Sequence, residues 1–192
     1  MTAFTDYLDL RVAVSEQVPG RDISDVMPRF VVLAETFFNE KLRHERMLTT
    51  ASLTVTSGEA DLPTDYIEAY RVKNGQRHLS AGTGAQSEDC LTIYAIEGNK
   101  LLYGTGDATI SLTYYAKLPT LTSSLTASNW LLAYYPDVYL YGVTAEAAKF
   151  LQERELADAM MTMRDNAMRD LRIMNNRRQW RDGVVRVDGA TP

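Results

Sequence analysis

The middle of the chain, residues 47 to 119, has the pattern of short strands joined by tight turns. β-Branched and aromatic residues alternate with polar ones at 53–56, 66–72, 91–96, 101–103 and 109–115. Turn-forming pairs separate these runs, namely Ser57-Gly58, Asn74-Gly75 and Gly98-Asn99. Strands this short, recurring about every ten residues, are typical of an antiparallel meander or a small sandwich.

Before this stretch, the apolar residues recur at helical spacing. We expect one helix that ends at Pro19-Gly20 and a second that has Pro28 in its first turn. The first has a loose apolar stripe of Phe4, Tyr7, Leu8, Val12 and Val18. The second has one broad apolar face of Phe30, Leu33, Ala34, Phe37, Phe38 and Leu42.

After the strand-rich stretch the helical pattern returns. Ser128 and Asn129 can cap a short helix, and Pro136 opens the next one. The polar segment 152–155 predicts a kink or a helix-helix junction. Beyond it, a long helix is predicted with an apolar seam of Leu156, Met160, Met163, Ala167, Leu171 and Met174.

These patterns predict an α+β fold, in which a small antiparallel β-domain interrupts a helical bundle. Residues 1–46 supply two N-terminal helices of the helical body, and 47–119 form the β insertion. Residues 120–180 supply the C-terminal helices of the same body, and 181–192 form an extended C-terminal tail. The tail has no helical period and cannot bury Val184, Val185 and Val187 by itself.

The charge of the chain is unevenly distributed. The formal net charge is -5, which disfavours a dedicated nucleic-acid binder because such proteins gain affinity by releasing counterions from phosphates. The segment from Arg164 to Arg186 contains seven arginines and only three aspartates. This arginine cluster is therefore net positive, and the rest of the chain is acidic. A solvated helix face is the alternative interpretation of the cluster.

The composition excludes several classes of protein. No apolar run approaches the roughly 20 residues that cross a bilayer, and the first residues lack a signal-peptide pattern. We therefore expect a protein that is made in a cytosol-like compartment and does not contact a membrane. Cys90 is the only cysteine, which excludes an internal disulfide and a cysteine-based metal site.

No group of residues has the pattern of a catalytic site. His44 lies in a charged helix end and is expected to be solvated, and His78 precedes Ser80 without an orienting carboxylate. The glycine-containing runs 82–85 and 104–106 lack the remaining features of a nucleotide-binding loop and are expected to be ordinary loops. Asp61 and Asp65 flank Leu62-Pro63 and are expected to serve a turn rather than a metal. We predict no enzymatic activity, no metal and no cofactor.

The segment 125–142, LTASNWLLAYYPDVYLYG, resembles a signature of phage head-tail adaptor proteins, which are also called head completion or connector proteins. Members often carry an earlier Leu-Pro-x-Asp-Tyr, which stands here as Leu62, Pro63, Thr64, Asp65 and Tyr66. They also run paired N-terminal helices into a β insertion and finish with a long helix and an extended tail, so the resemblance covers most of the chain. In 125–142 the candidate core or interface residues are Asn129, Trp130, Leu131, Leu132, Tyr135, Pro136, Asp137, Tyr139 and Leu140.

The resemblance implies a structural virion protein at the head-tail interface, assembled in the host cytoplasm. It implies a homo-oligomeric ring, commonly of about twelve copies, that docks under the portal protein and above tail or nozzle proteins. Packaged DNA would pass through the ring without specific binding, and an acidic body that repels DNA agrees with this. The end of the chain would bind the portal or a neighbouring subunit through Arg177, Arg178, Trp180, Arg181, Val184, Val185, Arg186 and Val187.

Two other functions are compatible with parts of the sequence. A DNA-contacting packaging or regulatory protein would use the arginine cluster, and its DNA binding would depend strongly on salt. A cell-wall hydrolase would need paired carboxylates in a cleft, and Asp65 or Glu88 would then be essential. The hydrolase has little support, because no group of residues in the sequence has the pattern of a catalytic site.

Overall fold

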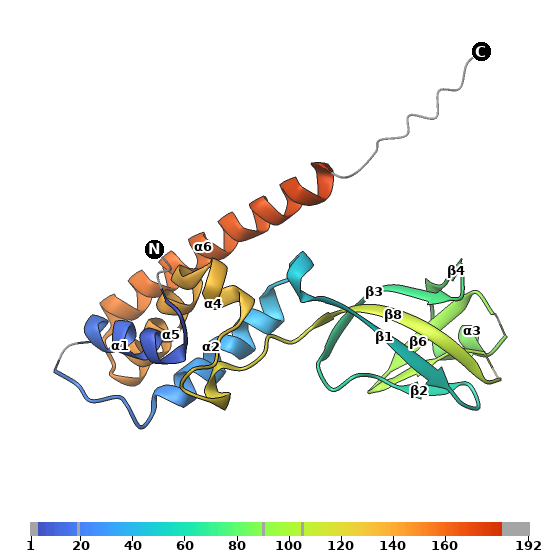
Figure 1. The fold of residues 1–192 in the computed structure, drawn as a ribbon, viewed down its shortest axis with the longest axis horizontal. Coiled ribbons are helices and arrows are strands. Elements are labelled where there is room, and N and C mark those ends of the chain that lie inside the picture. Colours follow the sequence, from blue (N-terminus) through green and yellow to red (C-terminus); the bar gives the residue numbers. More distant parts are fainter. Residues whose placement is uncertain (1–3, 19, 90, 105, 182–192) are drawn as a thin grey trace, which may run out of the picture. The chain divides into compact units, whose positions relative to one another are not determined.

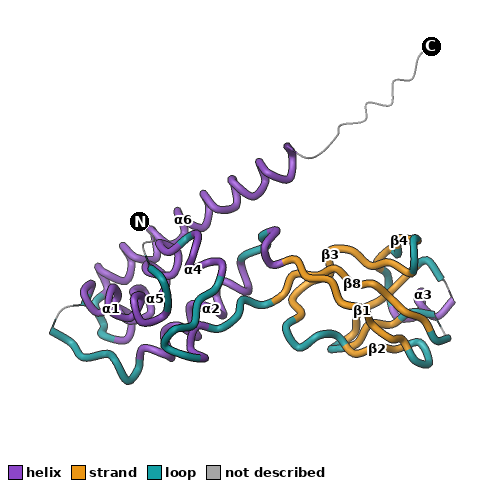
Figure 2. The backbone as a smooth tube through the Cα atoms, in the orientation of Figure 1, coloured by secondary structure: helices purple, strands orange, loops and turns teal. Residues whose placement is uncertain are grey.

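The computed structural model describes residues 4–18, 20–89, 91–104 and 106–181. The chain divides into two compact units (Figures 1 and 2). The helical unit contains the chain up to Leu42 and from Leu118 onward, and the β unit is Arg43–Lys117. Helices and two small sheets together make an α+β fold, and this prediction is confirmed.

The helical unit is organised around one central helix. It contains α1 (Tyr7–Gln17), α2 (Met27–Lys41), the 3-10 turn η2 (Leu121–Ser123), α4 (Trp130–Tyr134), α5 (Pro136–Phe150) and α6 (Arg154–Arg181). Helix α5 packs against α1, α2, α4 and α6 (Figure 1). Its small residues allow this close packing: a Cβ on Gly142 would lie 2.6 Å from Cζ of Phe38, so a larger side chain does not fit there.

The ends of the helices follow the local sequence. Asp6 caps α1 by accepting a hydrogen bond from the Asp9 N–H at 3.1 Å, and prolines stand in the first turns of α2 and α5. Helix α5 ends at Phe150 and α6 begins at Arg154, with Gln152 in the left-handed region at φ 62° between them. The polar segment 152–155 is therefore a helix-helix junction. Helix α6 continues through Arg181, one residue further than predicted.

The β unit contains two four-stranded sheets. The first has the order β1-β8-β3-β4, with strands Leu48–Val55, Ala108–Ala116, Tyr66–Asn74 and Arg77–His78. The second has the order β2-β7-β6-β5, with strands Glu59–Asp61, Lys100–Leu102, Ile93–Glu97 and Ser80–Ala81. Every strand pair in the described part of the chain is antiparallel except β5 with β6, which is parallel.

One hydrophobic core is shared by the two sheets, as in a small sandwich. Strands β1 and β8 of the first sheet contribute Val55, Ile110 and Leu112, and β7 of the second contributes Leu101, all fully buried. The three predicted turns lie at the reversals after β1, β3 and β6, where Gly75, for example, has a φ of 57°. Strand β8 pairs with β1 in one unbroken register, from Leu48 with Tyr115 to Val55 with Ala108.

Two local predictions in the β unit are wrong. Gly84 begins a six-residue helix, α3 (Gly84–Asp89), in the run predicted to be a loop; the Thr83 N–H donates to Oε1 of Gln86 at its start. His44 is fully buried instead of solvated. Its Nδ1 accepts a hydrogen bond from the Arg46 N–H at 3.1 Å, which caps the 3-10 turn η1 (Glu45–Met47).

Two predicted helix faces are shifted around their helices. In α1 the buried residues are Tyr7, Leu10 and Val14, whereas Leu8 and Val12 are 46% and 54% exposed. In α6 the predicted seam residues Met163 and Met174 are 46% and 54% exposed. The buried face of α6 is instead Ala157, Met160, Arg164, Met168, Leu171 and Asn175. Both helices therefore carry apolar side chains on a second, outward face.

Candidate functional site: the α4–α5 corner and the basic groove of α6

Asn129 is the organising residue of the segment that resembles the adaptor signature. It caps α4, because its Oδ1 accepts hydrogen bonds from the N–H groups of Leu131 and Leu132 at 3.1 and 3.0 Å. Its Nδ2 donates to the Pro119 carbonyl at 2.8 Å and to the Tyr139 hydroxyl at 2.7 Å. One side chain thus joins the incoming loop, the start of α4 and the second turn of α5.

A buried carboxylate from α2 completes this network. Tyr139 donates from its hydroxyl to Oε1 of Glu35 at 3.2 Å, and the same oxygen accepts the Leu121 N–H at 2.9 Å. The Tyr139 ring packs edge-on against Phe38, with centroids 5.3 Å apart. The Leu118 N–H donates to Oδ1 of Asn39, also on α2, at 2.8 Å. The segment that returns from the β unit, at Leu118 and Leu121, is therefore held by hydrogen bonds to two side chains of α2, Asn39 and Glu35.

Burial sets the ionisation of the two acidic groups in the network. Burial raises the pKa of the Glu35 carboxyl, and the hydrogen bonds from Leu121, Thr120 and Tyr139 act against that rise. Burial, followed by the charge of Glu35, raises the pKa of the Tyr139 hydroxyl well above its ordinary value. Glu35 was missed in the sequence; its place between Val31 and Phe38 on the apolar side of α2 was the available signal.

The other candidate residues at the junction of α4 and α5, between Trp130 and Leu140, are partly core and partly surface. Leu131, Leu132 and Tyr139 are completely buried, so they form core rather than contact surface. Trp130, Tyr135, Pro136 and Leu140 are half-buried, and Asp137 is exposed in the first turn of α5. Trp130 and Tyr135 meet edge to face with their centroids 6.4 Å apart.

The earlier motif, at Leu62 to Tyr66, lies in the β unit and secures the start of β3. Oδ1 of Asp65 accepts the Tyr114 hydroxyl at 2.9 Å, and its carbonyl accepts the Lys117 N–H at 2.7 Å. Leu62 is buried, Pro63 is half-buried, and the Pro63 carbonyl accepts the Tyr66 N–H at 3.0 Å. The turn predicted for this aspartate is therefore tied to β8. Burial, and then Asp65, raises the pKa of Tyr114 to about 12.

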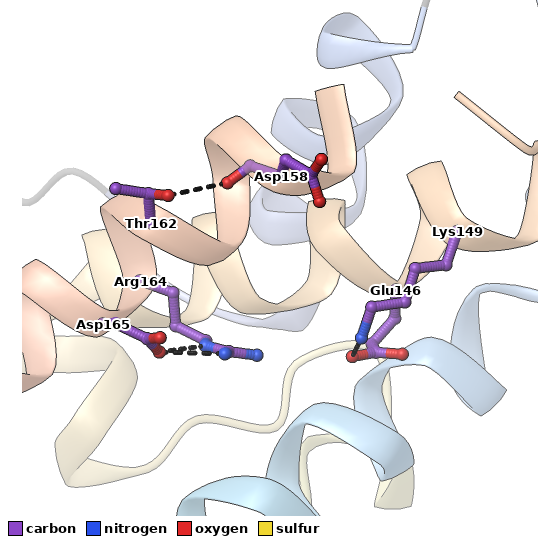
Figure 3. A network of polar contacts seen from close by, with 6 residues as sticks. All are labelled: Glu146, Lys149, Asp158, Thr162, Arg164 and Asp165. Atoms are coloured by element: carbon purple, nitrogen blue, oxygen red, sulfur yellow. Dashed lines mark hydrogen bonds and ion pairs between the residues drawn. The ribbon is translucent and has the colours of Figure 1, made fainter. Parts of the chain in front are cut away.

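The arginine cluster begins with a residue that is not solvated. Arg164 is 6% exposed, and its guanidinium carbon lies 3.8 Å from the centroid of the Phe37 ring. The same guanidinium forms a salt bridge with Asp165, from Nη2 to Oδ1 at 2.8 Å (Figure 3). Arg164 therefore serves the packing of α6 on α2.

Further along α6, arginines border an open groove. The groove has a volume of about 390 Å³ and is lined by Phe37, Lys41, Asp165, Met168, Arg169 and Arg172. We call it the basic groove. Arg169 donates to Oδ1 of Asn166 at 2.7 Å, and Arg172 donates to the Lys41 carbonyl at 2.8 Å. Within the part of the chain that the structure describes, both arginines bind neutral oxygens and neither pairs with a carboxylate.

The predicted partner-binding residues fall at the edge of the described structure. The backbone of α6 includes Arg177, Arg178, Trp180 and Arg181, but their side chains lie outside the described part. Val184, Val185, Arg186 and Val187 also lie outside it. Among the described residues there is no group of three or more metal-ligand side chains and no helix long and apolar enough to cross a membrane.

Of the residues singled out by sequence, Leu62, Asn129, Leu131, Leu132 and Tyr139 thus belong to the cores of the two units. The chain belongs to the SU10 adaptor protein family, whose model matches residues 5–188. The resemblance to phage adaptor proteins is confirmed, and the protein is a structural adaptor of a phage. No curated protein matches the chain.

Proposed function

We propose that this protein is a head-tail adaptor, a ring-forming subunit of the virion that docks under the portal protein and links the capsid to the tail. The ring contains about twelve copies, and packaged DNA passes through its channel without specific binding. Tail or nozzle proteins dock on its far side, and assembly takes place in the host cytoplasm. The protein has no enzymatic activity and takes no cofactor.

The match of the family model to residues 5–188 carries this proposal, because it extends over both units and beyond the end of α6. An adaptor must interact with other structural proteins of the phage. The distribution of charge supports docking on a partner and a channel that does not bind DNA. Seven arginines lie between Arg164 and Arg186, while the remaining chain is acidic. An acidic channel wall would repel DNA and let it slide.

We further propose that the segment after α6 makes the joint with the portal or with a neighbouring subunit. Val184 and Val185 are adjacent, and Val185 and Val187 alternate with Arg186 and Asp188 as in a strand that could be added to the edge of another sheet. The arginines just before it would pair with acidic groups of the same partner.

Truncation tests the joint directly. A chain that stops at Arg181 keeps all of α6, so we expect it to fold with the thermal stability of the full chain. We expect it to lose attachment to portal-bearing heads, measured by co-sedimentation. A matched control replaces 182–192 with a glycine-serine segment of equal length, and it should fail in the same way. Normal attachment of either variant would contradict docking through this segment.

Microscopy of whole particles tests the function itself. With the subunit tagged, density for a ring of this protein should lie between the portal and the tail. A position elsewhere in the particle would contradict the adaptor function. The DNA-binding alternative predicts instead that the isolated protein binds duplex DNA at about 50 mM salt and releases it steeply as the salt rises to about 200 mM.

A further inference from the structure

Helix α1 has an apolar ridge on its outward face. Leu8 and Val12 lie one helical turn apart and are exposed, and Glu16 continues the same row one turn later. The Leu8 N–H donates to the Leu125 carbonyl at 3.0 Å, which places the exposed Leu125 beside the ridge. We call Leu8, Val12, Glu16 and Leu125 the α1 ridge. Apolar side chains that are exposed together on one face of a helix are typical of a site of interaction.

The surroundings of the ridge are acidic. A shallow groove beside it is lined by Leu8, Arg11, Val12, Ser15, Glu16 and Ser24. The carboxylates here bind backbone N–H groups: Asp9 accepts from Thr5 at 2.8 Å, and Asp22 accepts from Ser24 at 3.0 Å. Glu16 makes no ion pair within the described residues. Arg11 is the one cation among the lining residues, and the carboxylates of Asp9, Glu16 and Asp22 outnumber it, so the net charge around the ridge is negative.

The basic groove has the opposite character. Half-buried Phe37 supplies the accessible apolar surface of the groove, since Met168 is only 3% exposed, and Ile173, 44% exposed, lies one turn beyond Arg169 on α6. Asp165 is paired with Arg164, and Lys41 is paired with Glu40 at 3.0 Å. Among the residues described at the groove, Arg169 and Arg172 are then the two cations whose charge is not offset.

We infer that the α1 ridge of one copy docks in the basic groove of a second copy, so that subunits associate head to tail through these two surfaces. Leu8 and Val12 would cover Phe37 and Ile173, and Glu16 would meet Arg169 and Arg172. The inference rests on the proposed ring and names the residues through which its subunits meet.

Three observations favour a second copy as the occupant. The two surfaces share no residue, and they are carried by α1 and by α2 with α6, which pack against α5 in one unit. Each surface combines apolar side chains with a net charge, which is negative at the ridge despite Arg11 and positive at the groove despite Asp165, so the net signs are opposite. A contact between two different surfaces of one subunit repeats from copy to copy, and such a heterologous contact is the kind that closes into a ring.

Charge exchange between the two surfaces tests this. Arg169→Glu and Glu16→Arg each reverse one charge at an exposed position, and the hydrogen bond of Arg169 within the described residues is to the Asn166 side chain. Sedimentation velocity of the full chain at about 50 mM salt should show concentration-dependent oligomers for the wild type. Each variant alone should bind itself at least about tenfold more weakly, because like charges then face each other. Circular dichroism and the melting temperature of each variant check that it is folded.

The decisive sample is the equimolar mixture of the two variants. In it, the reversed ridge of the Glu16→Arg variant can face the reversed groove of the Arg169→Glu variant, so that opposite charges meet again. The remaining contact between the two variants is the native one, so oligomers should return to the wild-type level. Arg77→Glu and Glu155→Arg are the matched controls, since both residues are exposed and lie outside the two surfaces. Both controls should associate like the wild type.

Several results would overturn the inference. These are a wild type that stays at 21.6 kDa up to millimolar concentration, variants that associate normally, and a mixture that does not recover. Loss of duplex-DNA binding by Arg169→Glu with unchanged self-association would show that the groove binds nucleic acid instead. If the variants associate normally while the tagged wild type lies between portal and tail, the contact surfaces are wrong and the adaptor function stands. If the tagged protein is absent from that joint, the proposed function fails whatever the sedimentation shows.

Discussion

Tyr139 and Glu35 are 104 residues apart in the sequence, and their side chains are joined by a hydrogen bond of 3.2 Å that Tyr139 donates. Glu35 precedes the β unit in the chain and Tyr139 follows it. The bond therefore connects the two separate segments of the helical unit. Asn129 extends the connection by donating to the Tyr139 hydroxyl, so three side chains from α2, α5 and the cap of α4 share one buried network.

Replacing Glu35 with Gln should change the pH dependence of stability. The folded protein raises the pKa of Glu35, so it holds this proton more tightly than the unfolded chain does. The stabilisation from Glu35 is therefore complete below the unfolded pKa and is lost as the pH rises through the folded one. Relative to the wild type, Glu35→Gln should gain in free energy of unfolding across that window. Urea denaturation from about pH 3.5 to about pH 8 measures the difference.

Removing the Asn129 side chain should destabilise the helical unit strongly. Asn129→Ala deletes the cap of α4 and leaves the Tyr139 hydroxyl and the Pro119 carbonyl without this donor. The loss of the cap alone costs about 1 kcal/mol, and the buried groups left behind add about 1–3 kcal/mol. Trp130 follows Asn129 directly and lies in the helical unit, so tryptophan fluorescence during urea unfolding reports this change. Ser128→Ala next to it should cost less than about 0.5 kcal/mol, and an equal effect of the two would contradict the role of Asn129.

Tyr114→Phe should weaken the β unit at neutral pH and change its response to alkali. The variant keeps the ring but loses the hydrogen bond to Asp65, at a cost of about 1 kcal/mol. Because the folded pKa of Tyr114 is raised from 10.0 to about 12, the wild type loses stability as the pH rises between these two values. The deficit of the variant should therefore shrink over that range, as followed by far-UV circular dichroism in urea. Tyr70→Phe, at an exposed position of β3, provides the control.

Arg164 should contribute to stability through its contact with Phe37 more than through its salt bridge. Arg164→Leu removes a buried guanidinium that lies over the ring, and the stacking of such a group is worth about 1–2 kcal/mol. Asp165→Asn removes only the exposed partner, which should cost less than about 1 kcal/mol. Equal losses from both substitutions, measured by thermal unfolding, would show that the ion pair is the dominant contact.

The sequence predicted those features that depend on local pattern. Strand runs with glycine turns, proline-started helices and the cap at Asn129 are set by neighbouring residues, and they were found where expected. The parallel pair of β5 with β6 was not expected, because strands of two residues leave almost no periodic signal.

The buried faces of the helices were harder to predict. Helices α1 and α6 have apolar residues on two sides, so periodicity alone could not decide which side meets α5. In α6 a long polar side chain, Arg164, occupies a core position by stacking on Phe37, which a hydrophobic pattern does not register. Glu35 was missed for a related reason, since its partners Leu121 and Tyr139 lie far away in the chain.

The division of the helical unit around the β unit sets an order of events on the ribosome. The β unit is one continuous stretch, so all of its strands have been made before the first residue of α5. At about 5–20 residues per second, α2 waits several seconds for the helix that covers Phe38 and Glu35. Translation therefore delivers a finished sandwich first and closes the helical unit last, when α5 and α6 leave the exit tunnel.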